Sequence, residues 1–261
     1  MMKGLEQNPE EDLRQAKEVL RWSNRKHGPD SAFSIRAMND VAEQLARQDR
    51  SSEEAVVREQ MVTAIQKSLG PDHDSTLSAE LKLAICLLTL ERAADATPLL
   101  AHVVEGRADA LGGDDPATLA AMAWSATAAR QLGKLSEARA VQEQVLSGLE
   151  LGGAGETPQA QSAAINLAST LADLEQTDEA VRLVRHVLEI RDRTLAPDDP
   201  RTLEALGTLV ALLLKARDIS SALELATALV ERRTRAYGAD AAETAQARDF
   251  LAAIHSEGNS I

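Results

Sequence analysis

Aromatic residues are scarce in this chain. Only five of its 261 residues are Phe, Trp or Tyr, although 44% are hydrophobic, so a core must be built from Ala, Leu and Val. The single cysteine, Cys86, excludes an internal disulfide framework and a cysteine-based zinc site. The hydrophobic runs at 83–88 and 209–214 fall far short of the roughly 20 residues that a membrane span requires.

Positive charge is also in short supply. The chain has 28 Lys and Arg residues against 41 Asp and Glu, a formal net charge of -13. Phosphate contacts need clustered Lys and Arg, so we expect no nucleic-acid partner. The acidic N-terminus lacks the apolar stretch of a signal peptide, and we expect a cytoplasmic protein without a membrane partner. The acidic excess is interpreted as a solvated outer face; alternatively, it attracts a basic partner.

The sequence repeats with a period of 42 residues. The related segments HGPDSAFSI, LGPDHDSTL, LGGDDPATL, LAPDDPRTL and YGADAAETA begin at 27, 69, 111, 195 and 237. A degraded copy, GAGETPQAQ, falls in the same register and needs no insertion or deletion. Such regular self-similarity is typical of a solenoid of stacked repeats.

Each repeated segment has the features of a helix start. Asp115-Pro116, Thr157-Pro158 and Asp199-Pro200 place a side-chain oxygen before a proline at the first helical position. Gly70 and Gly112 stand where the previous helix should end, which favours a left-handed C-cap, as at Gly238.

Helical spacing fills the rest of every repeat. Apolar residues recur at intervals of three and four, with one short break, which predicts a first-type helix, a tight turn and a second-type helix. Positions that lie 42 residues apart form a column of equivalent residues. The apolar columns extend backwards to Val19 and forwards to Leu251, so a half-repeat is expected at each end. We therefore predict one solenoid over 10–256, with a half-repeat at 10–26, repeats at 27–68, 69–110, 111–152, 153–194 and 195–236, and a capping helix at 237–256. Disorder is expected at 1–9 and 257–261.

The repeat resembles the tetratricopeptide repeat. The residues that carry the resemblance are Asn166-Leu167-Ala168 in a first-type helix and Leu132-Gly133 followed by Ala138 around a turn. The link from Leu111 to Leu119 and the long period are similar to the kinesin-light-chain-like subclass. The resemblance implies an all-α, right-handed superhelical solenoid of antiparallel helix pairs, with about 11–12 helices. HEAT and armadillo repeats share the range of periods but not this turn and helix start.

The chain departs from the family pattern at the turns. The turn glycine survives only as Gly133, and Asp49, Glu91, Glu175 and Arg217 replace it in the other repeats.

No catalytic motif is found in the sequence. There is no nucleophile elbow, no phosphate-binding loop with its lysine and no His-Glu-x-x-His, so we expect a protein that is not an enzyme and has no cofactor or metal. Cys86 lies among aliphatic residues and is interpreted as a small buried hydrophobe.

The resemblance implies that first-type helices line a concave groove where ligands bind. The positions that match are Arg36, Asn39, Asp40, Glu43, Lys82, Trp124, Thr127, Arg130, Asn166, Ser169, Asp173, Thr208 and Phe250. Trp124 and Phe250 are candidate anchors for a peptide. Alternatively, Trp124 packs on a neighbouring helix beside the small Ser125 and Ala129.

The sequence thus predicts a non-catalytic scaffold that binds a protein or peptide, with a preference for a basic one. The first alternative is a self-associating structural module, such as a homodimer. The second is a sensor of a small molecule, or an enzyme, with its site inside the superhelix.

Overall fold

A computed structural model describes residues 8–258, which form twelve α-helices and, within that range, no β-strand. The helices are α1 (Pro9–His27), α2 (Ala32–Ala46), α3 (Ser51–Leu69), α4 (Asp74–Thr89), α5 (Ala93–Leu111), α6 (Pro116–Gln131), α7 (Leu135–Leu151), α8 (Pro158–Asp173), α9 (Thr177–Thr194), α10 (Pro200–Lys215), α11 (Ile219–Tyr237) and α12 (Ala242–Gly258). The even-numbered helices are the first-type helices of the repeats and the odd-numbered ones are the second-type. None of the described helices is long and apolar enough to cross a membrane.

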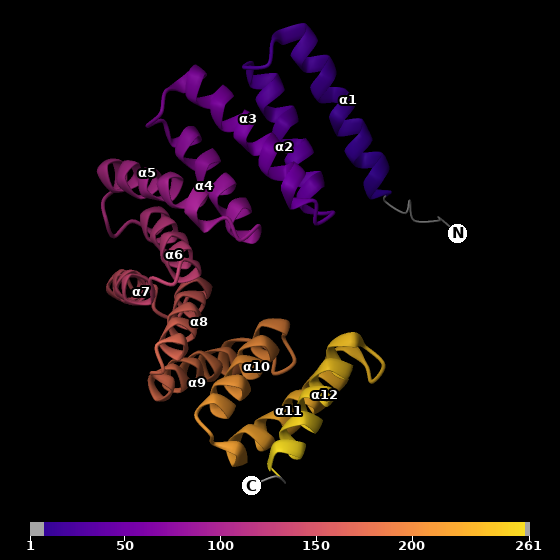
Figure 1. Ribbon diagram of the computed structural model, residues 1–261, viewed down its shortest axis with the longest axis vertical. Helices are drawn as coiled ribbons and strands as arrows, with labels where there is room; N and C mark the ends of the chain where they lie inside the picture. Colours follow the sequence, from indigo (N-terminus) through magenta and orange to yellow (C-terminus); the bar gives the residue numbers. More distant parts are fainter. Residues whose placement is uncertain (1–7, 259–261) are drawn as a thin grey trace. The chain divides into compact units, whose positions relative to one another are not determined.

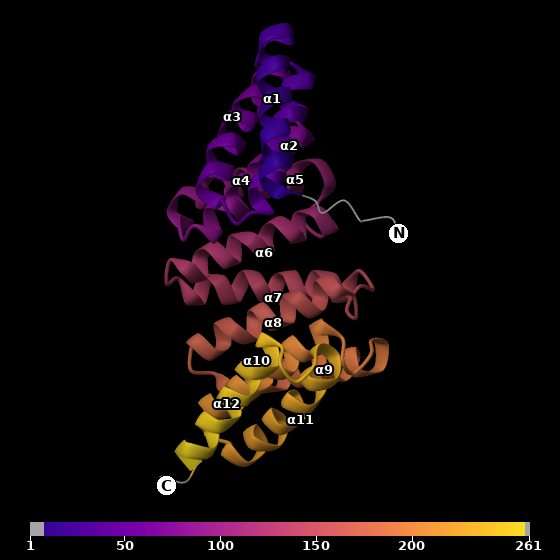
Figure 2. The same ribbon diagram turned by 90° about the vertical axis from the view of Figure 1, so that its right-hand side faces the viewer.

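The chain divides into two compact units at Lys134 and Leu135, with α1–α6 in unit 1 and α7–α12 in unit 2. Within each unit, consecutive helices pack side by side as stacked hairpins (Figures 1 and 2). The prediction of one continuous solenoid over 10–256 therefore stays a prediction. Residues 1–7 and 259–261, where disorder was expected, lie outside the described range, and the helices reach Pro9 and Gly258.

The predicted helix starts are present. Asp115 and Asp199 accept hydrogen bonds from the backbone amides of Ala117, at 2.8 Å, and Arg201, at 2.9 Å, and a proline opens α6, α8 and α10. The expected left-handed C-caps differ in one angle. Gly70 has φ 93° and ψ 165°, which is the extended positive-φ region that essentially only glycine adopts. The glycine therefore directs the chain into the next link in an extended conformation and does not adopt the left-handed helical conformation that was expected.

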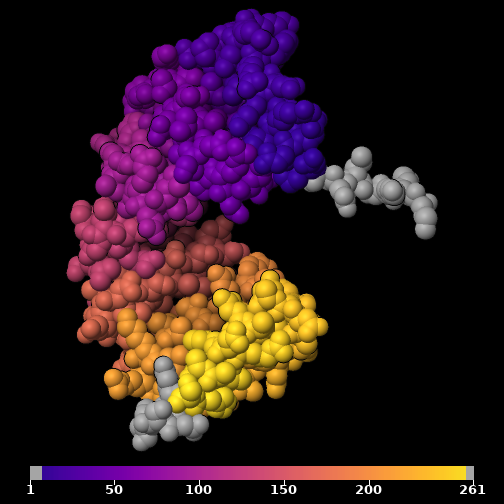
Figure 3. Space-filling view, turned by 45° about the vertical axis from the view of Figure 1, so that its right-hand side comes forward, coloured from indigo at the N-terminus to yellow at the C-terminus, as the bar shows by residue number. Residues whose placement is uncertain are grey.

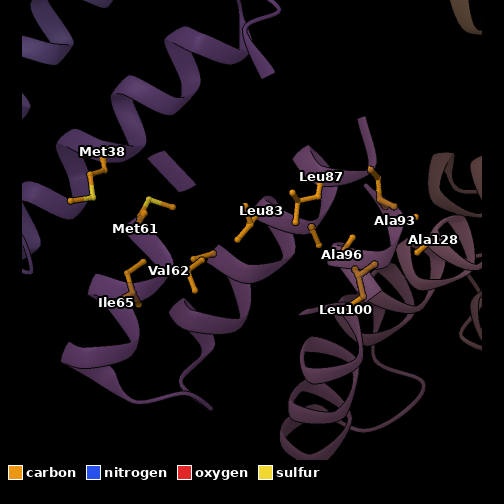
Figure 4. Packing of buried hydrophobic residues seen from close by; sticks show 13 residues of the cluster. Met38, Met61, Val62, Ile65, Leu83, Leu87, Ala93, Ala96, Leu100 and Ala128 are labelled. Atoms are coloured by element: carbon orange, nitrogen blue, oxygen red, sulfur yellow. The ribbon is translucent and has the colours of Figure 1, made fainter. Parts of the chain in front are cut away.

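Aliphatic side chains form the core of unit 1. Met38, Met61, Val62, Leu83, Leu87 and Leu100 meet in one cluster between α2, α3, α4 and α5 (Figure 4). Ala96 is fully buried within it, and Ala180 and Ala222 hold the same position in unit 2. A methyl group at this column lets the two helices of a hairpin approach closely, which explains why the chain needs so few aromatic residues.

Candidate functional site

The first-type helices of unit 1 present the predicted groove residues on a solvent-accessible face. Arg36, Asp40 and Glu43 on α2 and Lys82 on α4 are exposed, and Asn39, Thr127 and Arg130 are half-buried. Trp124 on α6 is 36% exposed, so part of its ring is covered and part is accessible. None of these side chains belongs to the buried core.

Several polar groups on this face are engaged locally. The Asn39 amide donates to the Glu43 carboxylate at 2.8 Å, one turn further along α2. The Thr127 hydroxyl donates to the Ala123 carbonyl at 3.1 Å. The Ser169 and Thr208 hydroxyls make the same bond to Ile165 and Glu204 in unit 2. These hydroxyls remain acceptors for a ligand, because each carbonyl bond uses only their proton.

Unit 2 places the other predicted residues on α8, α10 and α12. Asn166 and Asp173 are exposed, and Thr208 is half-buried. Phe250 is also half-buried and packs against the core cluster that contains Leu209 and Ile254. Phe250 is therefore not a freely exposed anchor, but its ring forms part of a pocket wall.

The pocket lies between α10, α11 and α12 and has a volume of about 400 Å³. Leu203, Leu229 and Phe250 give it apolar walls, and Gly207 opens it. A Cβ atom at Gly207 would lie 3.7 Å from Leu229 Cδ2, so any larger side chain at 207 would enter this space. The other repeats carry Asn39, Leu81, Ala123 and Ile165 in this column. The sequence signal for the pocket was thus one glycine in a column of larger residues.

Charged residues surround the mouth of the pocket. Glu204, Glu243 and Arg233 line it together with Gln246. Arg233 donates to the backbone carbonyl of Glu243 at 2.8 Å, which fixes the guanidinium beside the cavity. Two carboxylates against one guanidinium leave the rim with an excess of negative charge.

A histidine between two carboxylates links α4 and α5 in unit 1. His102 Nδ1 lies 2.6 Å from buried Glu80, and His102 Nε2 lies 3.2 Å from exposed Asp72. The hydrogen bond to Glu80 is the main cause that raises the pKa of His102, with Asp72 adding to it. Among residues 8–258, no three His, Cys, Asp or Glu side chains gather as a metal site.

Cys86 is buried, as the sequence predicted. Burial and the nearby Glu54 carboxylate raise the pKa of its thiol to about 11, so the reactive thiolate is suppressed near neutral pH.

An aromatic cluster at the start of unit 1 was not predicted. The Trp22 and His27 rings meet edge to face with centroids 5.6 Å apart, and His27 stacks on Phe33 at 4.8 Å. Lys26 Nζ lies 4.6 Å from the Trp22 ring centroid. Trp22 and Phe33 are exposed, and they lie near the end of α1 and at the start of α2, on either side of the link between these helices.

Comparison with protein families gives a match to the Tetratricopeptide repeat over residues 75–150 and 159–233, together more than half of the chain. No curated protein matches the chain significantly.

Solved structures with the same fold include kinesin-light-chain-type repeats. The nearly identical TPR-like repeats assigned to a kinesin light chain of Podosopora anserina align with a TM-score of 0.67 and 25% identity, over 78% of this chain and 96% of that one. BtubC (BKLC) from P. vanneervenii aligns with a TM-score of 0.72 and 15% identity, over 89% and 94% of the two chains. Aspartyl phosphate phosphatase F from Bacillus subtilis aligns with a TM-score of 0.69 and 11% identity, over 94% and 61%.

Proposed function

The chain belongs to the tetratricopeptide repeat family, and from that membership we propose that it is a non-catalytic scaffold that binds a protein or peptide along its first-type helices. The observation that carries the proposal is the pocket of about 400 Å³ beside α10 and α12. One of its lining residues, Phe250, is a predicted groove position, and Glu204 and Gln246 line it from the first-type helices α10 and α12.

The pocket suits one apolar side chain of a peptide. Leu203, Leu229 and Phe250 would cover such a side chain, and an aromatic or aliphatic anchor in a pocket is a common source of binding energy at interfaces. The negative excess at the rim, from Glu204 and Glu243 against Arg233, favours a basic residue next to the anchor. The net charge predicted a basic partner for the whole chain, and the rim of the pocket gives that preference a particular location.

A substitution that fills the pocket tests the proposal. A peptide selected from a random displayed library on the full chain is expected to bind Gly207→Leu at least about tenfold more weakly than the wild type, because leucine occupies the anchor space. Leucine is also a better helix former than glycine, so the fold of α10 should be retained. Calorimetric titration measures the dissociation constant.

Thr227→Leu is the matched control. Thr227 is exposed on the second-type helix α11 and does not line the pocket, so this variant should bind like the wild type. Equal binding by Gly207→Leu and the wild type would contradict the pocket. Trp124→Ala and Asn166→Ala test the rest of the groove in the same assay, and each should weaken a peptide that extends along those helices.

A further inference from the structure

The second-type helices inside each unit are covered on two sides. Val103 on α5 packs with Leu77 of α4 and Ala121 of α6. Leu229 on α11 packs in the same way with Leu203 and Leu206 of α10 and with Ala247 of α12. A residue in this column is therefore buried between the first-type helix of its own repeat and that of the next.

α1 lacks one of these two covers. It packs against α2, and no helix of the described residues in unit 1 occupies the place of a preceding first-type helix. Val19, in the column of Val103, is 53% exposed, whereas Met61, Val103, Val187 and Leu229 are at most 4% exposed. Trp22 is 49% exposed, whereas Ala64 and Ile190 in its column are 2% exposed. α1 thus presents an apolar face of a type that the repeats bury.

α12 lacks the complementary cover. It is a first-type helix that packs against α11, and no second-type helix follows it within the described residues. On α12, Arg248 and Ala252 are exposed and Ala245 and Leu251 are half-buried. Their equivalents in α10 are at most 1% exposed: Leu206, Val210, Leu203 and Leu209. Figure 3 shows α12, in yellow, open to solvent on the side seen there.

The side chains on the two open faces are complementary in size. Inside unit 1, Leu77 projects from α4 towards Gly106 of α5, where a Cβ atom would lie only 2.8 Å from the leucine side chain. Ile35 and Ala64 repeat this pairing of large and small residues one period earlier. At the open faces the order is reversed: Ala245 stands in the column of Leu77, and Trp22 stands in the column of Gly106. The small alanine leaves the room that a tryptophan on a second-type helix requires.

Hydrogen-bonding groups and preorganisation favour the same pairing. The first turn of α1 carries Glu10, Glu11 and Asp12, and the last turn of α12 carries the exposed His255. In an antiparallel hairpin, the end of the first helix lies beside the start of the second, so the His255 imidazole would lie beside these carboxylates, to which a ring N–H can donate. Contacts with His27 and Lys26 already hold the Trp22 ring, which lowers the entropy lost on binding.

We propose that a second copy of this chain covers these faces: α12 of one copy packs against α1 of another, and the two chains together complete one repeat. The interface is heterologous, since each copy uses a different face. It is separate from the proposed peptide site, because the pocket uses Gln246, Ala247 and Phe250 on another side of α12.

An exchange of side-chain sizes tests the proposal by sedimentation velocity of the full chain over a range of concentrations. Trp22→Ala removes the large partner and Ala245→Leu fills its space, so each single variant should associate at least about tenfold more weakly than the wild type. The double variant restores the large-and-small order of the repeats at 27–68 and 69–110 and should recover to within about threefold of the wild type. Trp124→Ala, which removes the other tryptophan, should associate normally.

Three results would overturn the proposal: a wild type that stays monomeric at every concentration, single variants that associate like the wild type, or a double variant no stronger than the singles. Circular dichroism confirms that each variant folds.

A mixing experiment distinguishes this interface from a symmetric dimer. Trp22→Glu leaves α12 intact and Ala245→Glu leaves α1 intact, so each variant alone should be monomeric and their mixture should form a 1:1 complex. Association of either variant alone, or none in the mixture, contradicts the pairing of α12 with α1.

Discussion

Four turn residues hold a backbone conformation that the family gives to glycine. Asp49, Glu91, Glu175 and Arg217 have φ values of 53°, 59°, 64° and 60°, close to the 74° of Gly133. These are the positions where the sequence departed from the repeat pattern. A left-handed conformation costs a residue with a Cβ atom about 1–2 kcal/mol, and backbone hydrogen bonds such as Gln176 N to Leu171 O, at 2.8 Å, hold the turn nonetheless. The repeat geometry thus overrides the local preference.

Restoring glycine should relieve this strain. Glu175→Gly and Arg217→Gly are each expected to raise the free energy of unfolding by about 0.5–1 kcal/mol, since the relief exceeds the added backbone entropy of unfolded glycine. Urea unfolding followed by circular dichroism measures the change. Glu175→Ala retains the Cβ atom and serves as the control, with little expected gain. Glycine variants that are less stable than the wild type would show that the side chains contribute more than the strain costs.

His102 makes stability depend on pH. Its hydrogen bonds to Glu80 and Asp72 raise its pKa in the folded protein above the ordinary value of 6.5. The folded state therefore binds the proton more tightly, so this contribution is complete below pH 6.5 and is lost as the pH rises through the folded pKa. We expect the stability difference between the wild type and His102→Gln to be larger at pH 6 than at pH 8. A difference that stays constant over this range would contradict the assignment.

At the scale of helices, an arginine at one repeat position joins three second-type helices, α5, α9 and α11, each to the first-type helix that follows it. Arg107 donates to the Ala117 carbonyl at 2.9 Å, Arg233 donates to Glu243 in the same way, and Arg191 donates to Arg201. Arg191 is buried and also bonds the Gln161 side chain at 2.9 Å. The guanidinium donates a further hydrogen bond to a carbonyl in the first turn of the following helix and ties the start of that helix to the preceding one.

Replacing Arg191 should loosen this junction. Arg191→Met keeps much of the buried volume but removes the charged donor, and we expect unfolding to cost about 1.5–3 kcal/mol less. Arg193→Met is the matched control: its ion pair with Glu156, at 2.8 Å, is exposed and should contribute at most about 1 kcal/mol. Chemical unfolding of both variants gives the comparison, and equal losses would argue against a special role for the buried arginine.

The helices could be predicted from the sequence because period, caps and small-residue columns all follow from local chemistry. The pocket could not, since it depends on how Gly207 lies against Leu229 on a different helix. Phe250 shows the same limit: its column predicted a groove position, but packing against α10 covers half of it. Val19 lies at a repeat position that is buried in the other repeats, yet it is exposed. Burial at this position requires a first-type helix on each side, and α1 packs against α2 alone among the described helices.

At the scale of the whole molecule, the fold consists of contacts between near neighbours. Nearly all packing within each unit joins consecutive helices, so stability should be a sum of local contributions, as in other repeat proteins. Both tryptophans, Trp22 and Trp124, belong to unit 1, whereas helices in both units contribute to circular dichroism. Two optical probes can therefore follow different parts of the same chain.

This separation gives a test of cooperativity. Arg191→Met weakens unit 2, and we expect it to lower the unfolding midpoint seen by circular dichroism while leaving the midpoint of tryptophan fluorescence unchanged. The reason is that a loss in one repeat reaches only its neighbours when interfaces between adjacent helices carry the stability. Head-to-tail association would couple copies of the chain, so the measurement is made at concentrations where sedimentation shows a monomer. Trp22 is retained because it is one of the two fluorescence probes. If both midpoints fall together, the two units unfold as one cooperative body and the additive description is wrong.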